Sequence, residues 1–246
     1  KVYVSVDPYY FRPTDVNVLM GDASKAKNQL GWRPKYNFND IVDEIIIIDH
    51  STTIQQSSSS EGGLAEMGGD VLYRWGNTSN YLGDSLGTQL LFAQHDANWL
   101  FKDDQVEDRI LLFNNGLRID NINYSSVDEI QLKRTGAYNY MLNVDEPDKD
   151  IIWSYNKFAD QGLYSKRMSG ARRIDSEITI ITESDYGRIF EIDKDGNIVW
   201  TYISPIDNTG VLSQGSIPQG NIVFKVESYS QAFFNDEVAP STEFDK

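Results

Sequence analysis

Cysteine is absent from the 246-residue chain, and histidine occurs only twice. Without thiols, the chain forms neither disulfides nor thiolate metal sites. Two histidines do not supply the ligands of a zinc site, and no aspartate-rich turn has the full spacing of a calcium loop. We therefore expect neither a bound metal nor a cofactor.

Long apolar runs and basic residues are also scarce. The longest apolar run is IIII at 45–48, whereas a membrane helix needs roughly 18 apolar residues in succession. The chain has 22 Lys and Arg against 37 Asp and Glu, a net charge of −15. Binding to phosphates depends on clustered Lys and Arg, so we expect neither nucleic acid nor a membrane as a partner.

The acidic residues are unevenly distributed along the chain. Hydrophobic residues make up 40% of the sequence, which predicts a folded protein of one or two domains. Residues 1–42 hold six basic and four acidic side chains, which leaves 16 basic and 33 acidic side chains for 43–246. This difference predicts two segments of different origin, with the boundary at 42/43.

The first segment has the pattern of a short α/β fragment. A strand at 2–6 precedes a short helix that Ser24 caps and Gly31 ends. Its stretch DPYYFRPTDVNVLMGDASKAKNQLGWRPKYNFNDIV, residues 7–42, resembles the C-terminal tail of GDP-mannose 4,6-dehydratases. The resemblance implies that Arg12 helps to hold a nucleotide, with Asp15 in place of the usual glutamate. The glycine-rich cofactor loop and the Tyr-Lys pair of that family are absent, so this segment cannot transfer a hydride.

From residue 43 onward the pattern changes to short apolar runs bounded by Gly, Asn, Asp or Ser. Several alternate apolar and polar residues, as half-buried antiparallel strands do, and none has helical periodicity. The runs are DEIIIIDH at 43–50, DVLYRWG at 70–76, RILLFNNG at 109–116, SVDEIQL at 126–132, DIIWSY at 150–155, EITIITE at 177–183, GRIFEID at 187–193, NIVWTY at 197–202 and NIVFKVE at 221–227. We predict an all-β segment, with the tract at 51–69 as a polar loop.

An internal repeat refines this prediction. In two copies, an inner apolar strand is followed by a strand ending in Asp/Glu-Ile and by a hairpin into Ile-Ile/Val-Trp-x-Tyr. Such a repeat, marked by Trp75, Trp153 and Trp200, is typical of β-propeller blades. We expect a partial propeller of about three to four blades, whose open edges favour self-association into a homo-oligomer.

The second segment is also similar to the bacterial arylsulfate sulfotransferases. The shared motifs, in chain order, are EIIIIDHSTT, GGDVLYRWGN, QLLFAQHDANWL, ILLFNNGLR, YSSVDEI and SGARRI followed by ITIITESDYGRIFEIDKDGNIVWTYISP. The resemblance implies a six-bladed propeller that moves a sulfuryl group from an aryl sulfate donor to a phenolic acceptor through a sulfated histidine. It also implies a periplasmic or secreted location, which this sequence does not report directly.

The stretch FAQHDANWLF at 92–101 contains His95, the better candidate of the two histidines for a catalytic role. Sulfuryl transfer needs a positioned nucleophile or base and cations on the sulfate oxygens. We place His95 just before the innermost strand of a blade as that nucleophile or base, with Arg118, on the same strand, binding sulfate oxygens. Asn98 would be a neutral donor, and Asp96 would orient the ring. The alternative is that His95 is a satisfied polar residue at a strand end.

Other residues are weaker candidates for binding the substrate. His50 matches the family but ends a buried strand, which favours a structural role. Arg74 and Arg188 either face the channel as cations or lie along the tryptophans of the blades. Of the pair Arg172 and Arg173, we expect one to face the channel and the other to face solvent.

Three functional hypotheses remain open. The first is a sulfotransferase-like propeller, incomplete or inactive in this chain. The second is a non-catalytic propeller that binds a ligand or protein, favoured because the family uses several histidines and this chain has two. The third, a sugar-nucleotide dehydratase, rests on residues 1–42 alone. Because no linker separates the two segments, a joined reading frame at 42/43 is a further hypothesis.

Overall fold

The computed structural model describes residues 28, 43–51, 53–82, 89–102, 105–119, 122–143, 145–156 and 162–229. For residues 82, 117–119 and 122 it describes the backbone alone. The chain divides into two compact units, residues 1–37 and 38–246, and the features below belong to the second unit. The predicted α/β fragment lies outside the described residues, apart from Asn28, which is helical.

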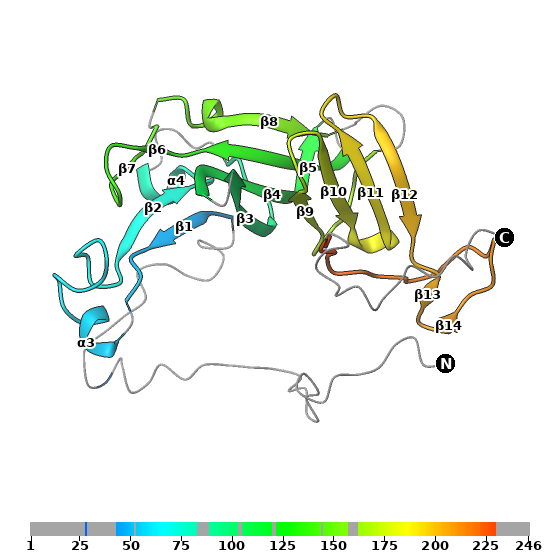
Figure 1. The fold of residues 1–246 in the computed structure, drawn as a ribbon, viewed down its shortest axis with the longest axis horizontal. Coiled ribbons are helices and arrows are strands. Elements are labelled where there is room, and N and C mark those ends of the chain that lie inside the picture. The colour runs from blue at the N-terminus through cyan, green and yellow to red at the C-terminus, as the bar shows by residue number, and fades with distance from the viewer. Residues whose placement is uncertain are drawn as a thin grey trace. The chain divides into compact units, whose positions relative to one another are not determined.

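The described part of the chain is all-β, as predicted (Figure 1). The strands are β1 Ile45–Ile48, β2 Val71–Trp75, β3 His95–Lys102, β4 Gln105–Ile119, β5 Ile122–Gln131, β6 Lys133–Arg134, β7 Tyr140–Met141, β8 Ile151–Tyr155, β9 Gly170–Arg173, β10 Ile178–Glu183, β11 Arg188–Asp193, β12 Ile198–Ile203, β13 Ile206–Asp207 and β14 Gly210–Val211. The helices are α3 Ile54–Ser57 and α4 Ser79–Leu82, with 3₁₀ turns at Pro147–Asp150 and Ser184–Tyr186. Among the described helices, none is long and apolar enough to span a membrane.

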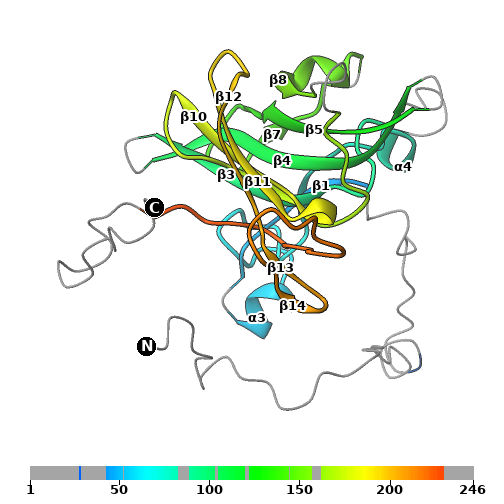
Figure 2. The ribbon, with the colours of Figure 1, turned by 90° about the vertical axis from the view of Figure 1, so that its right-hand side faces the viewer.

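Two four-stranded antiparallel sheets form the centre of the second unit. The first blade has the strand order β3-β4-β5-β8, and the second blade has the order β9-β10-β11-β12. Strand β9, at the edge of the second blade, lies against β3 and β4 of the first. Figure 2 shows the second blade from its outer side. This succession of meanders, with the edge strand of one blade against the next, has the build of a partial propeller.

The structure adds a strand in front of each predicted repeat. The sequence pattern had placed the runs at 109–116 and 177–183 innermost, but β3 and β9 precede them. Strand β3 was not predicted from the sequence. Its pairing with β4 shifts register between His95 and Asn98 and again between Trp99 and Phe101, which breaks the alternation of apolar and polar residues. Strand β9 is only four residues long. The predicted strand at 221–227 is not a strand in the structure.

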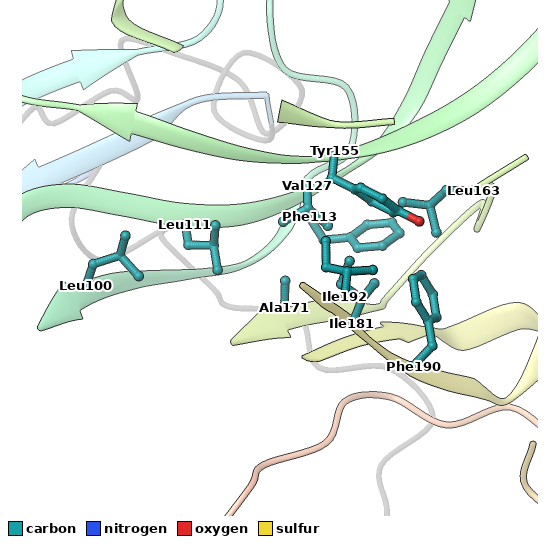
Figure 3. Close-up of a cluster of buried hydrophobic side chains, with 10 residues drawn as sticks. All are labelled: Leu100, Leu111, Phe113, Val127, Tyr155, Leu163, Ala171, Ile181, Phe190 and Ile192. Atoms are coloured by element: carbon teal, nitrogen blue, oxygen red, sulfur yellow. The ribbon is translucent and has the colours of Figure 1, made fainter. Parts of the chain in front are cut away.

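Both faces of the first blade are buried, and the sequence of β4 explains how. Leu111 and Phe113 point toward the second blade, whereas Ile110 and Leu112 point toward β1 and β2. A strand covered on both faces is apolar at successive positions, which is why this run reads as continuous. The core between the blades consists of Leu100, Leu111, Phe113, Val127, Tyr155, Leu163, Ala171, Ile181, Phe190 and Ile192 (Figure 3).

The polar tract between β1 and β2 folds around a buried carboxylate. The Asp49 side chain accepts hydrogen bonds from the backbone N–H of Ala65 and of Met67, at 2.9 and 3.0 Å. Within the tract, Thr53 caps the one-turn helix α3 by accepting from the N–H of Gln56. The sequence predicted a loop without helix here, and the difference is this single capped turn.

Candidate functional site

The His95 ring lies at the start of β3 and is held at one nitrogen. Its Nδ1 is 2.9 Å from the carbonyl oxygen of Ala93 and 2.9 Å from Oδ1 of Asn115. The Asn115 amide is oriented by its own Nδ2, which donates to the carbonyls of Ser165 and Met168 at 2.8 and 2.9 Å. Both neighbours of Nδ1 are therefore acceptors, so Nδ1 carries the hydrogen.

This tautomer leaves Nε2 of the neutral His95 ring with a lone pair. Among the residues that the structure describes, none hydrogen-bonds to Nε2. A histidine held at Nδ1–H by a fixed acceptor, with Nε2 available, is the arrangement of a nucleophile or general base. The buried Asn115 has the orienting role that the sequence had suggested for Asp96.

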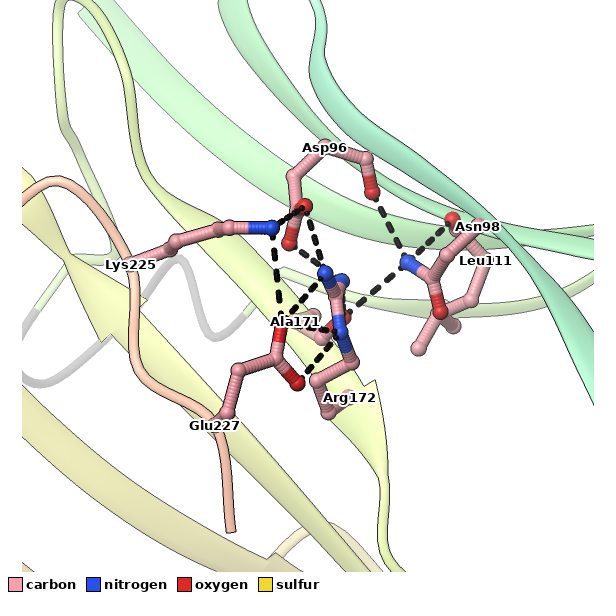
Figure 4. A network of polar contacts seen from close by, with 7 residues as sticks. All are labelled: Asp96, Asn98, Leu111, Ala171, Arg172, Lys225 and Glu227. Carbon is pink, nitrogen blue, oxygen red and sulfur yellow. Dashed lines mark hydrogen bonds and ion pairs between the residues drawn. The ribbon is translucent and has the colours of Figure 1, made fainter. Parts of the chain in front are cut away.

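Asp96 instead forms an ion pair with Arg172 across the two blades. Nη1 and Nη2 of the guanidinium donate to the two carboxylate oxygens, and the Nη2 bond measures 2.8 Å. On its other edge, Nε of Arg172 donates to both oxygens of Glu227, at 3.1 and 3.0 Å. Lys225 Nζ lies 3.4 Å from Asp96 and 3.4 Å from Glu227 (Figure 4). Of the paired arginines, Arg172 therefore belongs to the candidate site.

The backbone around this site is strained. Positive φ angles occur at four non-glycine residues that flank the starts of β3 and β9, namely Ala93 (50°), Asp96 (58°), Met168 (54°) and Ser169 (77°). Next to them, a Cβ on Gly170 would lie 2.2 Å from Oδ2 of Asp96, so only glycine allows this approach. Such strain costs of order 1–3 kcal/mol per residue and clusters at functional sites.

Asn98 connects the strands that carry the site. Its Nδ2 donates to the backbone carbonyls of Asp96, Leu111 and Ala171, at 2.8, 3.0 and 3.2 Å. These residues belong to β3, β4 and β9. The amide N–H groups of Asn98, which the sequence suggested as a neutral donor, thus already donate to backbone carbonyls.

Of two further candidates, the structure describes Arg118 by its backbone alone and does not bring His50 to His95. Arg118 lies on β4, paired with Asn123, and not on the strand that carries His95; its side chain is outside the described residues. His50 is exposed and follows β1. Among the described hydrogen bonds, its carbonyl accepts from Leu64 in the polar loop, and none joins it to His95.

Arg74 and Arg188 are each paired with a buried carboxylate. Arg74 donates from Nε and Nη2 to Glu44, at 2.6 and 2.7 Å, and Arg188 donates from Nε to Glu183 at 2.6 Å. Their guanidinium groups lie over a tyrosine and a phenylalanine ring, and not over tryptophans. Burial raises the pKa of Glu183 even though Arg188 acts to lower it. Each arginine thus neutralises a carboxylate that lies on, or next to, the strand paired with its own.

Arg173 lies between the blades, so neither arginine of the pair simply faces solvent as the sequence pattern had suggested for one of them. Its guanidinium is 4.7 Å from the centre of the Trp153 ring, and Nη2 donates to Glu129 at 2.6 Å. The pair at 172 and 173 alternates, as expected on a strand. One side chain reaches the candidate site, and the other reaches the outer strand of the first blade.

Three residues of the site were missed from the sequence: Asn115, Lys225 and Glu227. A signal for the first was present, because two asparagines interrupt an otherwise apolar run and a buried amide needs partners. Lys225 and Glu227 alternate with apolar residues in NIVFKVE, which places both on one side of an extended segment. In the described residues, no group of three His, Cys, Asp or Glu could hold a metal ion.

The first segment is similar to known proteins. Residues 1–45 match the family model of GDP-mannose 4,6 dehydratase. The human GDP-mannose 4,6 dehydratase is 47% identical over 49 residues, which are 20% of this chain and 13% of the human protein. The Sinorhizobium fredii (strain HH103) protein is 49% identical over 51 residues, covering 21% and 14%, and Arabidopsis thaliana GDP-mannose 4,6 dehydratase 1 is 41% identical over 66 residues, covering 27% and 18%.

These matches confirm the dehydratase resemblance of the first segment, and they cover a small part of each relative. The chain spans less than a fifth of the length of these curated relatives. No solved structure matches the chain. The family match ends at residue 45, and none of these matches supports the sulfotransferase resemblance of the second segment.

Proposed function

We propose that the blades belong to a propeller that transfers a sulfuryl group from an aryl sulfate to a phenol through Nε2 of His95. The observation that carries this proposal is the fixed Nδ1–H tautomer, because it presents a lone pair at Nε2 in a half-buried position. The motif resemblance of residues 43–246 supplies the reaction class.

The reaction would proceed in two balanced steps. Nε2 of His95 attacks sulfur, an N–S bond forms, and the S–O bond to the aryl group breaks to release the phenolate. The oxygen of the acceptor phenol then attacks sulfur, and the N–S bond breaks. The acceptor gives up its proton to solvent, and the released phenolate takes one proton from solvent. Asn115 holds Nδ1–H and stabilises the positive charge on the ring while sulfur is attached.

In this proposal, Arg118 has the role that the sequence suggested, as one cation that contacts the sulfate oxygens. Its backbone lies in β4, the strand that also carries Asn115. On this proposal, Arg118→Ala loses about 3 kcal/mol of transition-state stabilisation, comparable with the loss of one oxyanion donor.

A non-catalytic binding propeller is the second candidate, and one observation favours it. Each of Arg74, Arg172 and Arg188 is already paired with at least one carboxylate, which reduces the positive charge available to a sulfate. For the first segment, we propose descent from a GDP-mannose 4,6-dehydratase, with Arg12 as a nucleotide contact and without the hydride chemistry. Sequencing the source DNA through codons 40–46 tests whether the two segments form one native reading frame.

Turnover distinguishes the sulfotransferase from the binding propeller. We expect the complete propeller to sustain release of 4-nitrophenol from 4-nitrophenyl sulfate only when a second phenol is present, with ping-pong kinetics. His95→Ala should lower the rate at least about a hundredfold, while His50→Ala, which changes the other histidine, should leave it unchanged. Equal rates in the His95→Ala and wild-type proteins, or no turnover with any phenol, would favour the binding propeller.

A further inference from the structure

The segment after the second blade returns to the candidate site. Asn221 anchors its start, because the buried amide donates to the carbonyls of Tyr186 and Ser204 at 2.9 and 3.1 Å. Val223 N–H then donates to Ser184 at 3.3 Å. From this anchor the chain extends past β9 and brings Lys225 and Glu227 to Arg172 (Figure 4).

The guanidinium of Arg172 uses its two edges differently. One edge binds Asp96, whose side chain is only 7% exposed. The other edge, Nε with Nη2, binds the carboxylate of Glu227, which is 39% exposed. Planar two-point binding of this kind is how arginine recognises carboxylate, sulfate and phosphate groups. The oxygens of Glu227 therefore lie where the oxygens of an external oxyanion would lie.

The charges of the cluster support the same conclusion. Asp96 and Glu227 balance Arg172 and Lys225, so the four side chains together are neutral. Without the Glu227 carboxylate, two cations would face a single buried anion, and the cluster would have one net positive charge. Lys225 lies 3.4 Å from Glu227, close enough to contact an oxyanion in the same place.

We propose that Arg172 and Lys225 form a binding site for a small oxyanion such as the sulfate group of an ester, and that Glu227 occupies this site as an internal competitor. The site adjoins His95 through Asp96, the next residue. It rests on the proposed function and extends it by naming two cations, in addition to Arg118, that would hold the sulfate group, yet it does not require that sulfuryl transfer take place.

Sulfate binding to the full chain tests this inference. Titration calorimetry with sodium sulfate, against sodium chloride of equal ionic strength, would compare the wild type with Glu227→Gln. We expect up to about fivefold tighter binding by the variant, the size expected when an exposed ion pair worth up to about 1 kcal/mol no longer competes. Glu227→Asp, which withdraws the carboxylate by one methylene, should give an intermediate gain.

Two controls make the result specific. Glu146→Gln removes another exposed carboxylate, which pairs with Lys149 elsewhere, and its sulfate affinity should equal that of the wild type. The double variant Arg172→Gln with Glu227→Gln should lose the gain. Equal sulfate affinity of the wild type and Glu227→Gln, or an undiminished gain without Arg172, would overturn the inference. Sulfuryl transfer by His95 is read out separately as turnover, so either idea can fail alone.

Discussion

The two blades end in the same motif but bury it to different extents. Trp153-Ser154-Tyr155 closes the first blade and Trp200-Thr201-Tyr202 closes the second. Tyr155 is 6% exposed, whereas Tyr202 is 44% exposed and stacks on the equally exposed Trp200.

The cover over the first blade comes from the second blade. Phe190 contacts the ring of Tyr155 with a centroid distance of 6.2 Å, and Arg173 lies over the ring of Trp153. The described residues place no such layer over β12, where all six residues are exposed. The burial of this motif is thus set by the next blade and not by the strand that carries it.

Removal of the inter-blade contact should have the largest effect. Phe190 is fully buried against the first blade, so Phe190→Ala should lower the free energy of unfolding by about 3–5 kcal/mol, through lost burial and the cavity left behind. Urea denaturation provides the measurement. Trp200→Ala removes a larger but exposed ring and should cost less than about 1 kcal/mol. Similar losses in both variants would mean that the two outer strands are equally covered.

Arg173→Gln should have a smaller effect on the same interface. The substitution removes the contact with the Trp153 ring and one of the two arginine partners of the buried Glu129, while Arg109 remains. We expect a loss of about 1–3 kcal/mol in the free energy of unfolding. Arg167→Gln, which affects an exposed ion pair with Asp185, should cost less than about 0.5 kcal/mol. A loss no greater than that of the control would remove Arg173 from the inter-blade contact.

The smallest expected effect concerns association. Strand β12 is an uncharged edge strand with exposed aromatic rings, so we expect the chain to self-associate through it. Tyr202→Lys should lower the apparent mass in light scattering, whereas Ile152→Lys, on the edge strand of the first blade, should not. A wild-type chain that stays monomeric at all concentrations would contradict this expectation.

The sequence predicted the fold better than it predicted the site. Alternating runs located most strands, because a half-buried or buried strand imposes its period on the side chains. Strand β3 was missed because its irregular register hides that period. A sequence also does not show which element packs over a strand. The two Trp-x-Tyr motifs therefore look alike in sequence, although the tyrosine of one is buried and that of the other is exposed.

For the candidate site, the sequence suggested His95 and Arg172 by residue type but could not give the side chains that they contact. Asp96, adjacent in sequence, was the expected orienting residue, yet its positive φ turns the carboxylate toward Arg172 on the other blade. Asn115, twenty residues away, reaches the ring because β3 and β4 pair as antiparallel neighbours. Contacts of this kind depend on register and blade packing, which residue type does not encode.

The central claim is that Asn115 and the Ala93 carbonyl fix the ring hydrogen of His95 on Nδ1, so that Nε2 carries no hydrogen and keeps its lone pair. Nitrogen-15 NMR of the two imidazole nitrogens, at about pH 9 where an ordinary imidazole is neutral, reads this directly. The account predicts a protonated Nδ1 and an unprotonated Nε2 in the wild type, and a weaker preference in Asn115→Leu, where only the Ala93 carbonyl remains as an acceptor. A wild-type ring protonated at Nε2 would contradict it.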